Sequence, residues 1–113
     1  MYDLAQKNCS PAKASSINLK QLEIDEMIKE LTGWILVEKD FQQHLEKVFK
    51  FTNFNQAIAF SDQVAQIADE QDHHPAILTE WGKVTVTWWT HAIPGLHLND
   101  FIMAAKTDML YTT

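Results

Sequence analysis

The segment that most restricts the fold is 84–91, where successive side chains alternate between an apolar set and a more polar set. A period of two is typical of a strand with one buried face, because neighbouring side chains point to opposite sides of a sheet. The apolar set, expected on the buried face, is Val84, Val86 and Trp88. Trp89 and His91 share the opposite face, so they are candidates for a surface that meets a ligand or a partner.

A second strong pattern predicts a helix that begins after Thr52 or Asn53, either of which can cap it. Small and apolar side chains then recur at helical spacing over about four turns. This stripe consists of Phe54, Ala57, Ile58, Ser61, Val64, Ala65 and Ala68. Acidic residues follow at the end of the helix, where the helix dipole disfavours them, so that placement indicates either a function or a solvated polar end.

The remaining pattern completes an alternation of helices and strands. A helix is expected from Leu19 to Leu31, capped by Asn18 and stopped by Gly33. Strands are expected at 34–37, 41–51, 75–81 and 84–90, and a third helix at 101–111. The predicted fold is α+β, a four-stranded antiparallel sheet with three helices on one face, in the order α-β-β-α-β-β-α. An exposed sheet edge could accept a strand from a second subunit.

Composition limits the classes of protein to which the chain can belong. The 113 residues carry a net charge of −6, which argues against binding nucleic acid over a broad surface. Cys9 is the only cysteine, so no internal disulfide can form, and neither a membrane span nor a secretory signal is expected. We expect a cytoplasmic protein with a flexible lead-in at 1–18 and a single domain at 19–113.

Histidines and carboxylates in the second half of the chain form the constellation that could carry chemistry. His73, His74 and Pro75 lie between the second helix and the third strand, while His91 and Asp100 follow the best strand. Pro75 favours an extended backbone at His74. In a regular strand His73 and His74 would point to opposite faces, so a bend is required if both are to reach one pocket.

Three interpretations of these residues compete. They could be surface or hydrogen-bonded structural histidines, the usual explanation for any one of them alone. They could bind zinc or iron, which imidazole and carboxylate ligands suit, although no HExxH spacing is present. They could perform general acid–base catalysis on a small neutral substrate, because a histidine pKa near neutrality makes both protonation states available.

The motif Asp69-x-x-x-His73-His74-Pro75, followed by Trp81, His91 and Asp100, resembles the signature of the pterin-4a-carbinolamine dehydratases. Five residues separate Pro75 from Trp81, nine separate Trp81 from His91, and eight separate His91 from Asp100. The resemblance extends over about residues 19–111. It implies the dehydration of 4a-hydroxytetrahydrobiopterin to quinonoid dihydropterin, without metal or organic cofactor, in the recycling of tetrahydrobiopterin for aromatic amino acid hydroxylases.

The resemblance also implies roles for individual residues. His73 and His91 would exchange protons with the substrate, and His74 would position the pterin. Asp69 and Asp72 would hold histidine tautomers or raise histidine pKa values by proximity. The remaining substrate-binding candidates are Pro75, Thr90, Asp100 and Trp34. Thr90 would contact the pterin ring, and Asp100 would order His91 or a helix start. Trp34 would be either a stacking wall or a core residue.

The chain departs from the family pattern in places, one of them the stretch Ala76-Ile77-Leu78, which is less aromatic than in many relatives, and two rival functions remain open. His97 stands where relatives often have Ser or Thr, and Asn99 stands where some have arginine. One rival is a protein-interaction module, because some family members bind the dimerisation helices of a transcription factor. The other is a pterin-binding role in another pathway, such as molybdopterin metabolism. The family's habit implies a homodimer or homotetramer.

Overall fold

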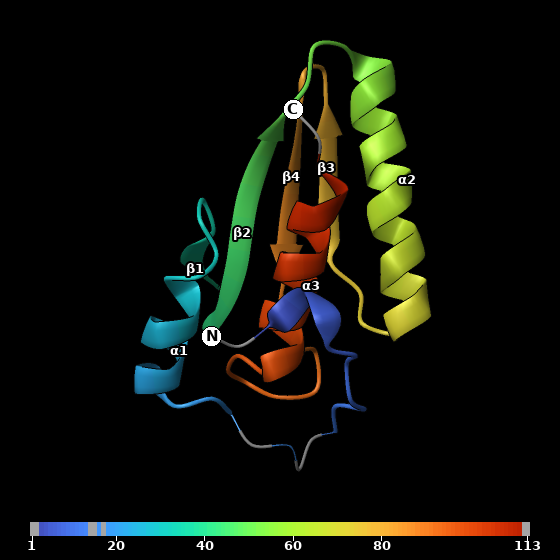
Figure 1. The fold of residues 1–113 in the computed structure, drawn as a ribbon. Helices are drawn as coiled ribbons and strands as arrows, with labels where there is room; N and C mark the ends of the chain where they lie inside the picture. The colour runs from blue at the N-terminus through green and yellow to red at the C-terminus, as the bar shows by residue number, and fades with distance from the viewer. Residues whose placement is uncertain (1–2, 14–15, 17, 112–113) are drawn as a thin grey trace.

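The computed structural model describes residues 3–13, 16 and 18–111 and has the predicted α+β architecture (Figure 1). Four strands form one sheet in the order β1-β2-β4-β3, and every neighbouring pair is antiparallel. The elements in chain order are η1 (Leu4–Gln6), α1 (Gln21–Ile28), β1 (Ile35–Lys39), β2 (Gln42–Lys50), α2 (Phe54–Gln71), β3 (Ala76–Glu80), β4 (Lys83–Trp88) and α3 (Leu98–Leu110).

The buried face of the sheet is the one that the alternation in β4 predicts. Val84, Val86 and Trp88 are fully buried, and β2 contributes the fully buried Leu45 opposite Trp88. α2 and α3 lie across this face, and α1 adds its buried side chains to the same core (Figure 1). Trp88 Nε1 donates to Thr107 Oγ1 at 3.0 Å, so the polar edge of this large side chain is satisfied inside the core.

α2 begins at the predicted cap but presents a different stripe to the sheet. Asn53 Oδ1 accepts a hydrogen bond from the backbone of Gln56 at 2.8 Å. The buried residues of the helix are Ala57, Phe60, Val64 and Ala68. Phe60, which the predicted stripe omitted, packs on Phe49 and Phe51, whereas Phe54 and Ile58 are exposed. The position of this aromatic cluster therefore sets the rotation of the helix.

Several boundaries also differ from the sequence analysis; α1, for example, ends at Ile28 rather than Leu31, and α3 begins at Leu98 rather than at residue 101. α1 begins after Lys20 rather than Asn18, and its first turn is closed by Glu23 Oε1 accepting from the Lys20 backbone at 3.0 Å. The β1–β2 turn consists of Asp40 and Phe41, both with positive φ, of 51° and 64°. Positive φ at both central residues makes a two-residue hairpin whose twist matches the strands. No helix in the described ranges is long and apolar enough to cross a membrane.

The described part of the lead-in contacts the helices that follow it. Leu4 is only 5% exposed and belongs to the core cluster. η1 lies against α3, where Lys106 Nζ donates to the Ala5 carbonyl at 3.0 Å (Figure 1). The burial of Leu4 and the hydrogen bond from Lys106 explain this contact. Residues 1–2, 14–15 and 17 of the lead-in, and residues 112–113 of the predicted domain, lie outside the described residues.

Candidate functional site

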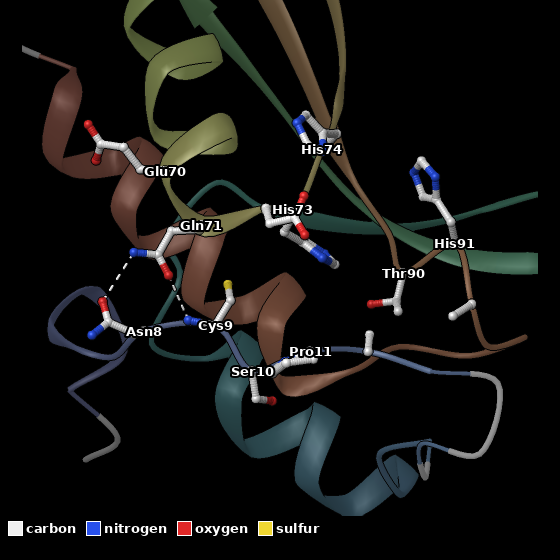
Figure 2. Close-up of a pocket in the computed structure, with 13 residues that line it drawn as sticks. Asn8, Cys9, Ser10, Pro11, Glu70, Gln71, His73, His74, Thr90 and His91 are labelled. Carbon is white, nitrogen blue, oxygen red and sulfur yellow. Dashed lines mark hydrogen bonds between the residues drawn. The ribbon is translucent and has the colours of Figure 1, made fainter.

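A cavity of about 670 Å³ lies where the end of α2, the end of β4 and the N-terminal segment meet (Figure 2). The first wall carries the three predicted histidines together with Asp72 and Thr90. A second wall is formed by the chain from Asn8 to Ala12. Glu70, Gln71 and Ala92 complete the lining. The fold therefore brings His73 and His74 to the same cavity as His91, which follows them by a whole hairpin.

A sharp change of backbone direction places His73 and His74 together. α2 ends at Asp72, which adopts the left-handed conformation with φ 51°. The His73 amide then donates to the Ala68 carbonyl at 3.1 Å, a bond typical of a left-handed helix end. Pro75 follows and begins the extended chain that enters β3. The structure thus contains the bend that the sequence analysis required.

Asp100 lies at the centre of the buried part of the site. Its Oδ1 is 2.7 Å from His73 Nε2, and its Oδ2 accepts from Thr90 Oγ1 at 2.8 Å. The His97 backbone also donates to Oδ2, at 3.0 Å, which closes the first turn of α3. The three groups therefore bond the same carboxylate, that of Asp100, which is 0% exposed. Such charge-assisted bonds are short and strong, so they fix the Asp100 side chain rigidly.

This arrangement selects one tautomer of His73. A carboxylate can only accept, so the neutral imidazole carries its proton on Nε2 and leaves Nδ1 as an acceptor. The ring also stacks on Trp88, with centroids 5.9 Å apart and planes at 11°. His73 is thus oriented by a charge on one edge and by a flat apolar surface on one face.

His74 has a similar partner in a different environment. Its Nε2 is 3.0 Å from Asp69 Oδ1, and both side chains are exposed to solvent. The acidic end of α2 therefore faces a histidine.

His91 is held by an aromatic stack on the outer side of the sheet. Its ring lies on Trp89, with centroids 4.7 Å apart and planes at 19°. Trp89 in turn contacts His44 of β2, with ring centroids 4.6 Å apart. His91 is exposed, in agreement with its predicted face, whereas the neighbouring Thr90 is buried on the core side.

The other predicted site residues divide into those that belong to the site and two, Pro75 and Trp34, that are not among the described residues lining the cavity. Thr90 and Asp100 belong to the site through their mutual hydrogen bond, and Asp72 lines the cavity while ending α2. Trp34 is a core residue, the second of its two predicted roles. It packs edge-on against Phe49 and its Nε1 donates to Asp108 at 3.0 Å, so it is not among the described residues that line the cavity.

The second wall of the cavity was not predicted. Cys9 is half-buried there, and burial raises the pKa of its thiol to about 11, although Lys106 nearby opposes this shift. The Cys9 amide donates to Gln71 Oε1 at 2.7 Å. Asn99 bonds the backbone of Ser10 through both its side-chain oxygen and its nitrogen. The polar, small-residue sequence of 8–12 gave no signal of these contacts.

His97, one of the departures from the family pattern, is the N-cap of α3. Its Nδ1 accepts from the Asn99 backbone at 3.0 Å, as a serine or threonine oxygen would. Burial lowers the pKa of His97, and the charge of Asp100 works in the opposite direction. In the part of the chain that the structure covers, His, Cys, Asp and Glu side chains form no group of three or more that could hold a metal ion.

Comparison with known proteins identifies the family of this chain. The family model described as pterin 4 alpha carbinolamine dehydratase matches residues 17–110. A protein of Marinobacter nauticus is 50% identical over 111 residues, covering 98% of this chain and all of its own. A protein of Vibrio cholerae is 51% identical over 107 residues, covering 95% of this chain and 98% of its own. Both are provisionally named pterin-4-alpha-carbinolamine dehydratases.

Two solved structures share the fold. The transcriptional coactivator/pterin dehydratase of Brucella melitensis has a TM-score of 0.77 at 31% identity, covering 85% of this chain and all of that one. A pterin dehydratase-like protein, identified as a RuBisCO assembly factor in the alpha-carboxysome, has a TM-score of 0.58 at 28% identity, covering 69% of this chain and 88% of that one. By the extent of the family match and by the identity to full-length relatives, this chain belongs to the pterin-4-alpha-carbinolamine dehydratase family.

Proposed function

We propose that the protein is a hydro-lyase that dehydrates a 4a-hydroxytetrahydropterin. In this reaction the C4a–O bond breaks and the hydroxyl leaves as water. The N5–H bond also breaks, and a double bond forms between N5 and C4a to give the quinonoid dihydropterin. The observation that carries the proposal is one cavity lined by His73, His74 and His91, in which the first is buried against the carboxylate of Asp100.

His73 is the proposed base. Its free Nδ1 would take the proton from N5, and the imidazolium that results would be stabilised by Asp100 at 2.7 Å. Charge developed beside a buried, fully bonded carboxylate is stabilised more strongly than charge in water. This arrangement makes proton gain at His73 favourable at the moment when the substrate needs to lose one.

His91 is the proposed acid, and His74 is the proposed positioning residue. His91 is exposed, so after it protonates the leaving hydroxyl it can recover a proton from solvent. Its stack on Trp89 keeps the ring at the mouth of the cavity. His74, paired with Asp69, would bind the pterin from the side of β3.

The direct test follows the decay of freshly generated 4a-hydroxytetrahydropterin by ultraviolet absorbance. The protein should accelerate the decay, and His73→Ala and His91→Ala should each lower the rate by roughly 10²- to 10⁴-fold, the usual worth of a general acid or base. Gln66→Ala, an exposed change on α2, is the control. If His91→Ala loses activity only because the variant unfolds, as a matching fall in its melting temperature would show, His91 is structural and its proposed role fails.

A protein-interaction role is the second candidate. Both solved relatives carry descriptions that include such a role, and α2 exposes the apolar side chains of Phe54 and Ile58. The same surface suits self-association into the dimer or tetramer that we expect. A folded protein that leaves the decay of the carbinolamine unchanged would favour this candidate. Two other roles, tetrahydrobiopterin recycling for a hydroxylase and a role in molybdopterin metabolism, both require that the protein bind a pterin.

A further inference from the structure

We propose that residues 8–12, the strap, form a substrate-binding wall that holds the pterin ring against the histidines. The inference rests on the proposed function and extends it to a segment outside the histidine motif. The strap lines the same cavity as His73, His74 and His91, from the opposite side (Figure 2). A flat bicyclic substrate in this cavity would have imidazoles on one side and the strap on the other.

The first anchor of the strap is Asn99, which is only 2% exposed. Its Oδ1 accepts from the Ser10 amide at 3.0 Å, and its Nδ2 donates to the Ser10 carbonyl at 2.7 Å. This two-point bond fixes both the position and the direction of the strap. Asn99 immediately precedes Asp100, so one helix start holds the strap and the carboxylate partner of His73.

The second anchor is Gln71, at the last position of α2. Its Oε1 accepts from the Cys9 amide at 2.7 Å, and its Nε2 donates to Asn8 Oδ1 at 3.1 Å. Gln71 lies two residues before His73. The two walls of the cavity are thus joined through residues directly beside the proposed catalytic groups, as a wall of defined spacing requires.

The chemistry of the strap suits an uncharged ring. Its sequence is Asn-Cys-Ser-Pro-Ala, and the only ionisable side chain, that of Cys9, stays protonated near neutral pH because burial raises its pKa to about 11. A neutral wall excludes water from one side of the substrate without adding a competing acid or base.

Amide hydrogen exchange in the unaltered protein tests the contact, with biopterin as the probe. Binding is first established independently, from quenching of tryptophan fluorescence. Both the Cys9 and the Ser10 amide already donate, to Gln71 and Asn99. We expect bound biopterin to slow their exchange by at least about five-fold, because it would cover the strap and restrain the local opening that exchange requires. If biopterin binds without slowing this exchange, the inference about the strap is wrong, but the proposed function still stands. If biopterin does not bind, the strap inference falls together with the proposed function.

Kinetics of anchor variants provide a second test that separates binding from chemistry. Gln71→Ala should raise KM by about five-fold and leave kcat within about two-fold, because the strap binds ground state and transition state alike. Asn99→Ala, at a more buried position, should show the same split. Gln66→Ala, the same change at an exposed site of α2, should leave KM unaltered. Fast exchange of the Cys9 amide in Gln71→Ala would show that the strap has been released in this variant. An unaltered KM in a variant released in this way would overturn the inference.

Discussion

His73 Nε2 lies 2.7 Å from Asp100 Oδ1, and neither side chain has appreciable contact with solvent. The two residues are 27 positions apart in the chain: His73 lies in the connection between α2 and β3, and Asp100 lies in the first turn of α3. Asp100 serves two purposes in this position, because the carboxylate that orients His73 also accepts the His97 amide at the start of α3. The helix cap and the proposed catalytic base are therefore held by the same group.

Asp100→Asn is expected to separate orientation of the base from protein stability. An amide cannot accept all the bonds that the carboxylate accepts, and its NH₂ group favours the opposite tautomer of His73. We expect kcat to fall by about 10²-fold or more and the free energy of unfolding to fall by about 1–3 kcal/mol. Steady-state kinetics give kcat, urea unfolding gives the free energy of unfolding, and nitrogen-15 shifts of the His73 ring report its tautomer. Reduced stability with full kcat and an unaltered tautomer would make Asp100 a helix cap alone.

The aromatic stack predicts that Trp89 positions His91. Trp89→Leu removes the surface on which the His91 ring lies at 4.7 Å. Because an aromatic pair contributes about 0.5–1.5 kcal/mol, we expect kcat to fall by about 2- to 10-fold. Trp81→Leu is the matched control, because Trp81 is 74% exposed in the turn between β3 and β4, at the opposite end of β4 from Trp89. An equal loss in the two variants would contradict the positioning role.

His97 predicts a pH dependence of stability. Because its folded pKa lies below the ordinary value of 6.5, the unfolded state binds the proton more readily. Its contribution is complete above pH 6.5 and is lost as the pH falls from there through the folded pKa. The groups that face it are Asp100, which opposes the shift, and His73, which adds to it.

His97→Asn provides the measurement for this prediction, because asparagine also caps helices but does not titrate. Unfolding free energies from urea titrations should be similar for the two proteins near neutral pH. The wild type should become progressively less stable than the variant as the pH falls below 6.5. Parallel pH profiles would show that His97 protonation is not linked to folding.

The β1–β2 turn predicts a stabilising substitution. Phe41 has φ 64° and is 94% exposed, so its side chain gains little from packing while its backbone is strained. Phe41→Gly should raise the free energy of unfolding by about 1 kcal/mol, because glycine adopts this conformation without steric cost. Phe54→Gly, at the start of α2, should instead destabilise the protein. A loss of stability in Phe41→Gly would contradict this account.

Local patterns in the sequence were sufficient for much of the fold. The alternation from Val84 to Trp88 identified the buried face of β4, because a strand has only two sides. Asn53 identified the start of α2, because capping depends on neighbours three residues away. Pro75 and the paired histidines indicated that a bend would be needed at the end of α2. Each of these inferences depends on interactions within a few residues.

The tertiary structure alone decided which groups face one another across the chain. The pairing of Asp100 with His73, the docking of Ser10 on Asn99 and the rotation of α2 about Phe60 all depend on contacts between distant segments. Such contacts form only after helices and sheet have packed, so no local pattern encodes them. The sequence by itself determined the elements and the chemical groups available, whereas packing decided how those groups form a site.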